Sequence, residues 1–436
     1  MTLDGFRLVK VLSAFLTAWS LAACGSLDWS AERAAALRAV EAPIIESTDV
    51  DALFAAPLDR EAALRLALVN SPEFGRLLAW HQSEFAEAQA SGRLANPRFS
   101  YERLRSPEGL DIERWVSLGV IDLLTWPQRR RLAAADLESV RVQLAMTVID
   151  RMTEVRQAWV RAVAASEKRG YAERVLASAE ASAELARRME SAGNFNRLER
   201  ARQQSYEADA RARLTLARQH ELEERESLVR LLGLNAQQAA ALQLPARLPD
   251  LPIEPRSPAD VSANINATRL DLRLANATWQ SLNARRGLTS VNSLAELELA
   301  LREGEPRGFE VEVMLPVFDL GDLQRTAARA WAESAMQALK QTSIAASSDL
   351  RVSYSAYRSA FDNAVHHRDV LVPLRRSMSE EALLRYNGML IGVFELLADA
   401  RDQIETVVAA IEAQERFWLA EATLQSSLLG RPGVVR

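Results

Sequence analysis

Cysteine and histidine often carry chemistry in proteins, and this sequence contains few of either. Cys24 is the only cysteine among 436 residues. A disulfide needs a second thiol and a cysteine-ligated metal site usually needs several, so a single chain can form neither. The thiol must therefore be free or chemically modified. Adjacent residues point about 100° apart on a helix, so His366 and His367 make no i, i+4 ligand pair. We expect a solvated stretch there, with no metal and no cofactor.

The segment before Cys24 has the composition of an export signal. Arg7 and Lys10 are basic, and an apolar run follows them at residues 11–23. A run of about a dozen residues is too short to span a membrane, which takes ~20. The string LAAC at 21–24 resembles the bacterial lipobox, which implies cleavage before Cys24 and acylation of its thiol. The alternatives are a buried cysteine in an ordinary signal or an uncleaved anchor.

We therefore divide the N-terminal region into a lipoprotein signal peptide at 1–23 and a lipidated linker at 24–57. Gly25 and Ser26 follow Cys24, so no Asp stands directly after the cysteine. By resemblance to lipoprotein sorting, this favours the outer membrane. Several acyl chains anchor a protein stably where one chain would be marginal.

The composition favours long helices and gives no sign of nucleic acid binding. The formal net charge is only −5, and the 17 glycines are few, whereas Ala, Leu, Arg and Glu are abundant. No later run of 18 or more apolar residues occurs, so strands must make any further membrane crossing. The sequence contains no P-loop and none of the strings G-x-G-x-x-G, G-x-S-x-G or H-E-x-x-H. We therefore expect no enzyme activity.

Very long helices are predicted in both halves of the chain. Residues 128–191 contain no proline and a single glycine, Gly170. Val148, Met152 and Val155 belong to an apolar stripe with steps of three and four, by which a helix buries one face. At 1.5 Å per residue this segment is a rod of nearly 100 Å, far too long for a compact domain. The other predicted helices are 194–232, 322–386, which is broken only by Pro373, and 394–429.

Between the helices the hydrophobic period changes to two. Phe309, Val311 and Val313 alternate with glutamates in the segment 308–315, and leucines do the same in 294–301. Each of these strands has one apolar and one polar face. About ten residues per strand matches a tilted transmembrane β-strand. A weaker strand pair is predicted at about 97–104 and 112–122.

The order of strand pair, long helix, break and return helix occurs twice, and each copy ends in Leu-Leu-Gly. We interpret the chain as a tandem duplication. Four strands cannot close a barrel, and an open edge in lipid leaves backbone groups unsatisfied at high cost, so other protomers must complete it. The segments are a first repeat at 58–244, a Pro-rich linker at 245–258, a second repeat at 259–430 and a C-terminal tail at 431–436.

Seven short strings are typical, in their order and spacing, of one protein family. They are LDREAALRLA (58–67) with NSPE (70–73), RMESAGNF (188–195), TRLDLR (268–273), LPVFDLG (315–321), RYNG (385–388) and FELLADAR (394–401). Together they resemble the outer-membrane efflux protein (TolC-like) family, specifically its lipoprotein members that serve resistance-nodulation-division pumps. The resemblance covers nearly all of the mature chain. The first strand exit at 122–127 departs from the Pro-(aromatic)-Asp-Gly-Gly-like turn of many members.

The resemblance implies a mainly α protein with a small β part. Three protomers would each give four transmembrane strands to a twelve-stranded outer-membrane β-barrel, and their coiled helices would form a periplasmic α-barrel. The implied function is a passive exit duct for substrates delivered by an inner-membrane resistance-nodulation-division transporter and a periplasmic adaptor. The implied partners are two further copies of the chain, the adaptor, the transporter and outer-membrane lipid. The alternative is a structural coiled-coil envelope lipoprotein, which explains the lipobox and the rods but not the strands.

Two groups of residues are predicted to be functional. The breaks shared by both repeats would be hairpin tips that face the adaptor, unless they are ordinary helix breakers. Alternating glutamates in the second strand pair would face a polar lumen, or else a merely solvated wall. The basic run 128–131 is interpreted as the aqueous end of the barrel rather than a binding patch. The predicted tip residues are Gly193, Asn194, Phe195, Gly388, Ile391, Gly392, Val393 and Phe394, the lumen residues are Glu296, Glu298, Glu310 and Glu312, and the lipidation residue is Cys24.

Overall fold

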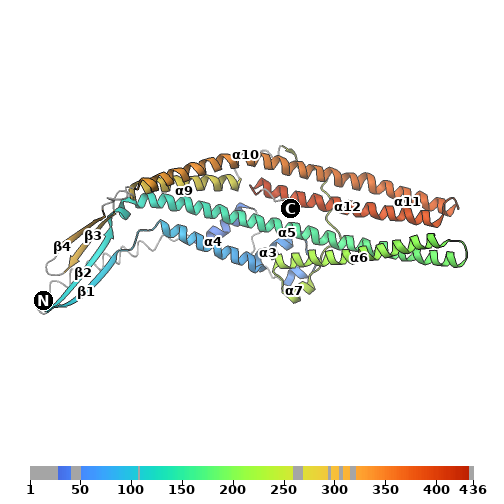
Figure 1. Cartoon of the computed structure of the whole chain (residues 1–436), viewed down its shortest axis with the longest axis horizontal. Helices are drawn as coiled ribbons and strands as arrows, with labels where there is room; N and C mark the ends of the chain where they lie inside the picture. The colour runs from blue at the N-terminus through green and yellow to red at the C-terminus, as the bar shows by residue number, and fades with distance from the viewer. Residues whose placement is uncertain are drawn as a thin grey trace.

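A computed structural model of the chain describes residues 28–40, 51–106, 109–258, 269–292, 296–303, 308–314 and 321–431. Cys24 and the predicted signal peptide lie outside these ranges. In the described part, a small sheet lies at one end of a long helical bundle and two helical hairpins form the other end (Figure 1). Among the described helices, none has both the length and the apolar character needed to cross a membrane.

The first repeat is built on the longest helix of the bundle. This helix, α5 (Val120–Ser191), has 72 residues, which corresponds to about 108 Å at 1.5 Å per residue. The return helix α6 (Arg197–Leu232) ends at Gly233, whose φ of 70° suits glycine. The other elements are α2 (Trp29–Ala39), the 3₁₀ turn η2 (Asp51–Phe54), α3 (Arg60–Asn70), α4 (Pro72–Ser91), β1 (Arg98–Ser106), β2 (Gly109–Gly119) and α7 (Ala236–Ala241).

The second repeat has a similar order of elements. Its shaft consists of α10 (Asp322–His366), the π-helical turn η3 (His367–Leu371) and α11 (Val372–Asn387). The predicted break at Pro373 is thus a single widened turn, because proline lacks an N–H and clashes with a regular preceding turn. The remaining elements are α9 (Leu270–Asn292), β3 (Glu296–Glu303), β4 (Gly308–Met314) and α12 (Val393–Leu428).

The four described strands form one antiparallel sheet in the order β1-β2-β3-β4. The bounds of β1 and β3 differ by one or two residues from those predicted, although residues 293–295 lie outside the described part. The predicted end of the second strand at 122 is wrong, since β2 ends at Gly119. Pairing with β3 stops at the pair Gly119 and Glu298, so the following backbone groups form helical hydrogen bonds instead.

The predicted apolar stripe of α5 forms the main core. Val148, Val155 and Val163 have no exposed surface, and Trp159 is 2% exposed. The indole Nε1 of Trp159 donates a hydrogen bond to the carbonyl of Leu58 at 2.8 Å. The stripe packs chiefly with buried side chains of α3 and the end of α6. Burial of this stripe at mid-length therefore joins the start and the end of the first repeat.

The Pro-rich linker crosses the helices as an extended strap, which we define as residues 244–258. Its backbone is held by side chains from the helices of both repeats. Trp418 and Gln414 of α12 both donate to the carbonyl of Pro249, and Glu167 of α5 accepts from the N–H of Leu248. On α10, the hydroxyl of Tyr354 donates to the Arg256 carbonyl, and that of Tyr357 accepts from the Arg256 N–H. The strap thus fastens three helices at mid-length.

One histidine of α4 is buried against α5. His81 is 1% exposed, and its Nε2 lies 2.9 Å from the hydroxyl of Thr147, which itself donates to a backbone carbonyl. Nε2 is therefore the donor, and the buried Nδ1 has no partner in the described part of the chain. Burial lowers the pKa of His81 below its ordinary value of 6.5.

We expect the free energy of unfolding to fall as the pH drops through about 6.5 toward 5. The unfolded chain takes up a proton near its ordinary pKa, whereas folded His81 resists, so its contribution is complete only above that pKa. Denaturant unfolding of wild-type protein and the His81→Gln variant at pH 5–8 measures the difference. His220→Gln is the matched control, because His220 is exposed on α6. If the His81→Gln variant lost stability between pH 8 and pH 5 as steeply as the wild-type protein, this assignment to His81 would be contradicted.

Candidate channel sheet and helix tips

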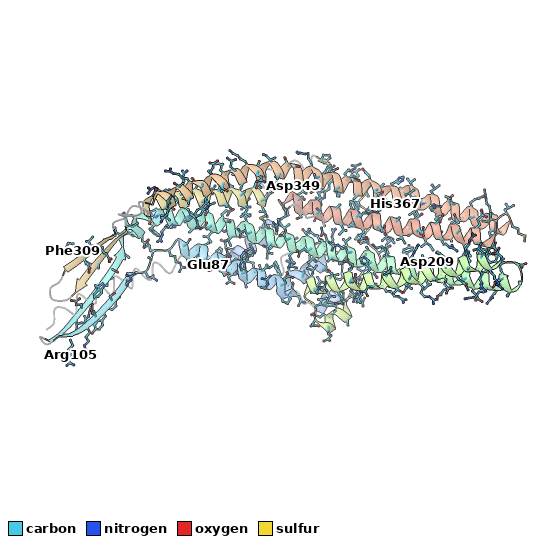
Figure 2. The ribbon with its side chains drawn as sticks, in the orientation of Figure 1. Glu87, Arg105, Asp209, Phe309, Asp349 and His367 are labelled. Carbon is cyan, nitrogen blue, oxygen red and sulfur yellow. The ribbon has the colours of Figure 1, made fainter. Side chains whose placement is uncertain are left out.

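The sheet has one strongly apolar face that the described part of the chain leaves uncovered. Register and strand alternation bring side chains from all four strands to this face. Phe309 is 74% exposed and Leu301 is 65% exposed, values unusual for large apolar side chains in water. Figure 2 shows Phe309 at the sheet end of the molecule. The exposed apolar residues of this face are Phe99, Tyr101, Val116, Leu118, Leu299, Leu301, Phe309 and Val311.

The opposite face of the sheet carries the predicted lumen residues. Glu298 is paired with Glu312 and Ala300 with Glu310, so the register places the glutamates of β3 and β4 on one face. Glu310 and Glu312 have exposed side chains, whereas the side chains of Glu296 and Glu298 lie outside the described part. Like charges directly opposite each other are destabilising in a sheet, and water or cations reduce that cost. The polar face is therefore suited to an aqueous surface.

The first helical hairpin turns in a compact glycine-capped loop. The N–H of Gly193 bonds to the carbonyl of Glu190, and the N–H of Asn194 bonds to that of Met189. This is the Schellman pattern, in which the residue after the cap adopts a left-handed conformation, and Gly193 has φ of 78°. Asn196 then starts α6 with a capping box.

The second hairpin has the same hydrogen bonds but a different residue in the left-handed position. The N–H of Met389 bonds to the carbonyl of Tyr386, and the N–H of Leu390 bonds to that of Arg385. Met389 has φ of 60°, while Gly388 is an ordinary cap with φ of −80°. The two predicted tip glycines therefore occupy positions that differ by one residue, since Met389 takes the place of Gly193. A left-handed conformation is strained for methionine, whose side chain is 93% exposed.

The two tips of one chain touch each other through an aromatic stack. The rings of Phe195 and Phe394 lie with centroids 4.5 Å apart and planes inclined by 24°. Both phenylalanines, with Ile391 and Val393, are half-buried, so these four of the predicted tip residues are not freely exposed to a partner. The exposed apolar residues at the tips are instead Met389, Leu390 at 77% and Leu198 at 61%.

Below the stack, polar contacts continue to join the two hairpins. The guanidinium of Arg401 on α12 lies 3.7 Å from the ring centroid of Tyr206 on α6 and donates to Gln203 at 2.9 Å. Arg213 and Glu405 form an exposed ion pair at 3.5 Å. Burial raises the pKa of the Tyr206 hydroxyl, and the nearby charge of Arg401 partly opposes this. These surface contacts are weak compared with the core at mid-length.

The predicted tip residues include neither Met389 nor Leu198, although both lie within the predicted tips. The available signal was their position within a few residues of the predicted breaks. Within the described ranges, no three acidic, cysteine or histidine side chains gather as a metal ion would require. The exposed His366 and the half-buried His367 lie on the shaft of the second repeat, and Figure 2 shows His367 far from the sheet and nearer the hairpin tips.

The fold itself, a long helical bundle with a small terminal sheet, is that of outer-membrane channels. A membrane protein from Pseudomonas aeruginosa superposes with a TM-score of 0.69 at 20% identity, over 89% of this chain and 97% of that one. The CmeC outer membrane channel of Campylobacter jejuni gives 0.73 at 14% identity, over 86% and 87%. The outer membrane protein VceC of Vibrio cholerae gives 0.70 at 14%, over 85% and 96%. The sequence matches no protein-family model and no curated protein.

Proposed function

We propose that this protein is the outer-membrane exit duct of a tripartite efflux pump. The observation that carries the proposal is the exposed apolar face of the sheet, at the far end of the bundle from the two hairpin tips. Such a face is unfavourable in water and suited to lipid. The fold shared with CmeC, an outer membrane channel, supports the same assignment. The TolC-like strings in the sequence extend it to efflux.

In this proposal three copies of the chain close one barrel. The sheet order leaves β1 and β4 as open edges in the described part of each chain, and lipid does not tolerate open edges. Three chains of four strands would make a twelve-stranded barrel, with the apolar face toward lipid. Glu296, Glu298, Glu310 and Glu312 would face the water-filled lumen and favour cations. The helices would continue the duct through the periplasm.

The tips are proposed to meet a periplasmic adaptor, which connects the duct to an inner-membrane resistance-nodulation-division transporter. Exposed Met389, Leu390 and Leu198 give the adaptor an apolar surface at the end farthest from the sheet. No chemistry is required of the duct, because the transporter supplies the energy. The proposed location is the bacterial outer membrane, with the helices in the periplasm.

Planar-bilayer recording combined with crosslinking tests this function. Purified protein should conduct ions in a bilayer, and crosslinking in detergent should stop at three subunits. The Glu310→Gln, Glu312→Gln variant should conduct with reduced preference for cations while remaining trimeric. A stable oligomer without conductance would favour the alternative, a structural coiled-coil envelope lipoprotein. A monomer that keeps its strands in lipid would contradict the shared barrel.

The proposed lipid anchor at Cys24 has its own test. Cys24→Ser should abolish labelling of the protein by radioactive palmitate, because serine offers no thiol for acylation. Delivery to the outer membrane should slow, since loss of the acyl chains removes the stable anchor. Wild-type protein labelled in parallel is the control. Unchanged labelling of the variant would refute lipidation at this residue.

A further inference from the structure

A patch of apolar, aromatic and basic side chains lies where the first strand pair joins the helices. We define this collar patch as residues 93–94 after α4 together with Leu123, Leu124, Trp126, Arg130 and Arg131 of α5. Leu124 is 68% exposed and Leu123 is 48% exposed, and they follow β2 directly. The arginines come two helical turns later, about 10 Å farther from the sheet. Apolar, aromatic and basic side chains thus succeed one another along the axis.

Two contacts fix the α4 end of this patch against α5. The indole Nε1 of Trp126 donates to the carbonyl of Gly92 at 3.2 Å. A Cβ on Gly92 would lie 2.7 Å from that of Ala133 and 3.8 Å from the Cα of Arg130, so the end of α4 and the backbone of α5 touch here. Arg93 and Leu94, both exposed, therefore lie beside the basic turn of α5. The end of α4 and the start of α5 therefore form this patch together.

The positive charge of the patch is largely uncompensated. Arg129 is paired with Asp122 at 3.1 Å, and Asp136 is occupied by Arg285 and Ser281. In contrast, Arg131 is exposed and forms no ion pair with any residue that the structure describes, and Arg130 lies 5.3 Å from the ring centroid of Trp126. Their guanidinium groups are free to hold a phosphate in a fork of N–H donors.

We propose that the collar patch binds the headgroup of an anionic phospholipid in the leaflet nearest the helices. This rests on the proposed insertion of the sheet in a membrane. With the apolar face in lipid, Leu123 and Leu124 continue that surface toward the helices, and Trp126 lies at the interface, where tryptophan is favoured. Arg93, Arg130 and Arg131 then lie at headgroup level. Their positive charge should favour a phospholipid with net negative charge over a zwitterionic phospholipid.

Native mass spectrometry of the full-length protein in detergent tests this site with two probes, dioleoylphosphatidylglycerol and dioleoylphosphatidylcholine. Wild-type protein should retain the anionic lipid preferentially. The variant Arg130→Gln, Arg131→Gln should lose affinity for it by roughly fivefold per arginine, from the ~1 kcal/mol that a basic side chain gains near an anionic surface. The matched control is Arg202→Gln, Arg351→Gln, which removes two exposed arginines from α6 and α10 and should bind like wild type.

Three outcomes would overturn the site. Equal retention of both lipids by wild-type protein would do so even if the double variant failed to fold. An equal loss in the control variant would show non-specific attraction to charge. Loss of the oligomer with unchanged lipid preference would make the patch a contact between subunits. Bilayer conductance is measured on the same preparations. A conducting wild-type protein without lipid preference refutes only the site, whereas absence of conductance refutes the proposed function.

Discussion

Replacing Met389 and Leu390 with aspartate is expected to abolish efflux while the protein remains folded. Both side chains are more than three-quarters exposed at the second tip, so the substitutions remove little internal packing. Burial of a Met or Leu side chain by a partner stabilises a complex by about 1.5–3 kcal/mol. Two charged replacements should therefore weaken adaptor binding by at least about a hundredfold. Two measurements report the effect: co-purification with the adaptor, and export of a substrate that the wild-type protein exports.

Ile253→Asp is the matched control for this tip variant. Ile253 is 96% exposed, but it lies in the strap far from the tips. Its replacement should leave adaptor binding unchanged. Aspartate at Phe195 and Phe394 would be a poorer test, because those rings stack on each other and their loss would also separate the hairpins. Normal export by a correctly assembled Met389→Asp, Leu390→Asp protein would show that the tips are not the docking surface.

Arg269→Ala is expected to destabilise the protein by about 3–5 kcal/mol, the largest effect of any substitution proposed for stability. Arg269 is 1% exposed at the start of α9. Its guanidinium donates to the carbonyls of Ala346 and Ser427 at 3.2 Å each and forms a bidentate pair with Asp271. Truncation removes the donor of two carbonyls and the cationic partner of the largely buried Asp271 carboxylate, which keeps the N–H of Leu272. Denaturant unfolding in detergent measures the loss.

Arg273→Ala, one helical turn later, provides the control. Arg273 pairs with Glu138 at 2.6 Å, but both side chains are exposed to solvent at 46% and 37%. Exposed ion pairs are worth about 0–1 kcal/mol, so the unfolding midpoint should move little. Arg269→Lys should fall between the two, because lysine keeps the charge but not the planar fork. Equal unfolding midpoints for Arg269→Ala and Arg273→Ala would show that the buried network is unimportant.

Periodicity predicted the sheet well because strands and helices differ so strongly in period. The alternation of Phe309, Val311 and Val313 with glutamates fixed both the strand and its faces. The end of β2 was missed because residues 120–124 are apolar enough for either structure. Which one forms there depends on where partner strands end, and pairing is a tertiary property. The bounds of Leu-rich junctions therefore cannot be obtained from local pattern alone.

The tips show a similar limit. A turn between two long helices was predictable from the breaks near Gly193 and Gly388, but its register was not. A glycine in a break suggests a left-handed residue, yet in the second tip Met389 adopts that conformation. The stack of Phe195 on Phe394 joins residues far apart in the sequence, so no local signal could indicate that these rings are partly buried. Predicting which tip side chains remain exposed required the packing of both hairpins.

The strap at 244–258 has a mechanical consequence for the bundle. Side chains of α5, α10 and α12 form hydrogen bonds with its backbone near the middle of the long helices, where the core is also most buried. Beyond this point the contacts that the structure describes between the hairpins include one aromatic stack and the polar contacts of Arg401 and Arg213. Each hairpin therefore extends as a long arm from the point where the strap holds the helices. A small rotation of the second hairpin at the strap would therefore become a large displacement at Met389, at the far end of that hairpin.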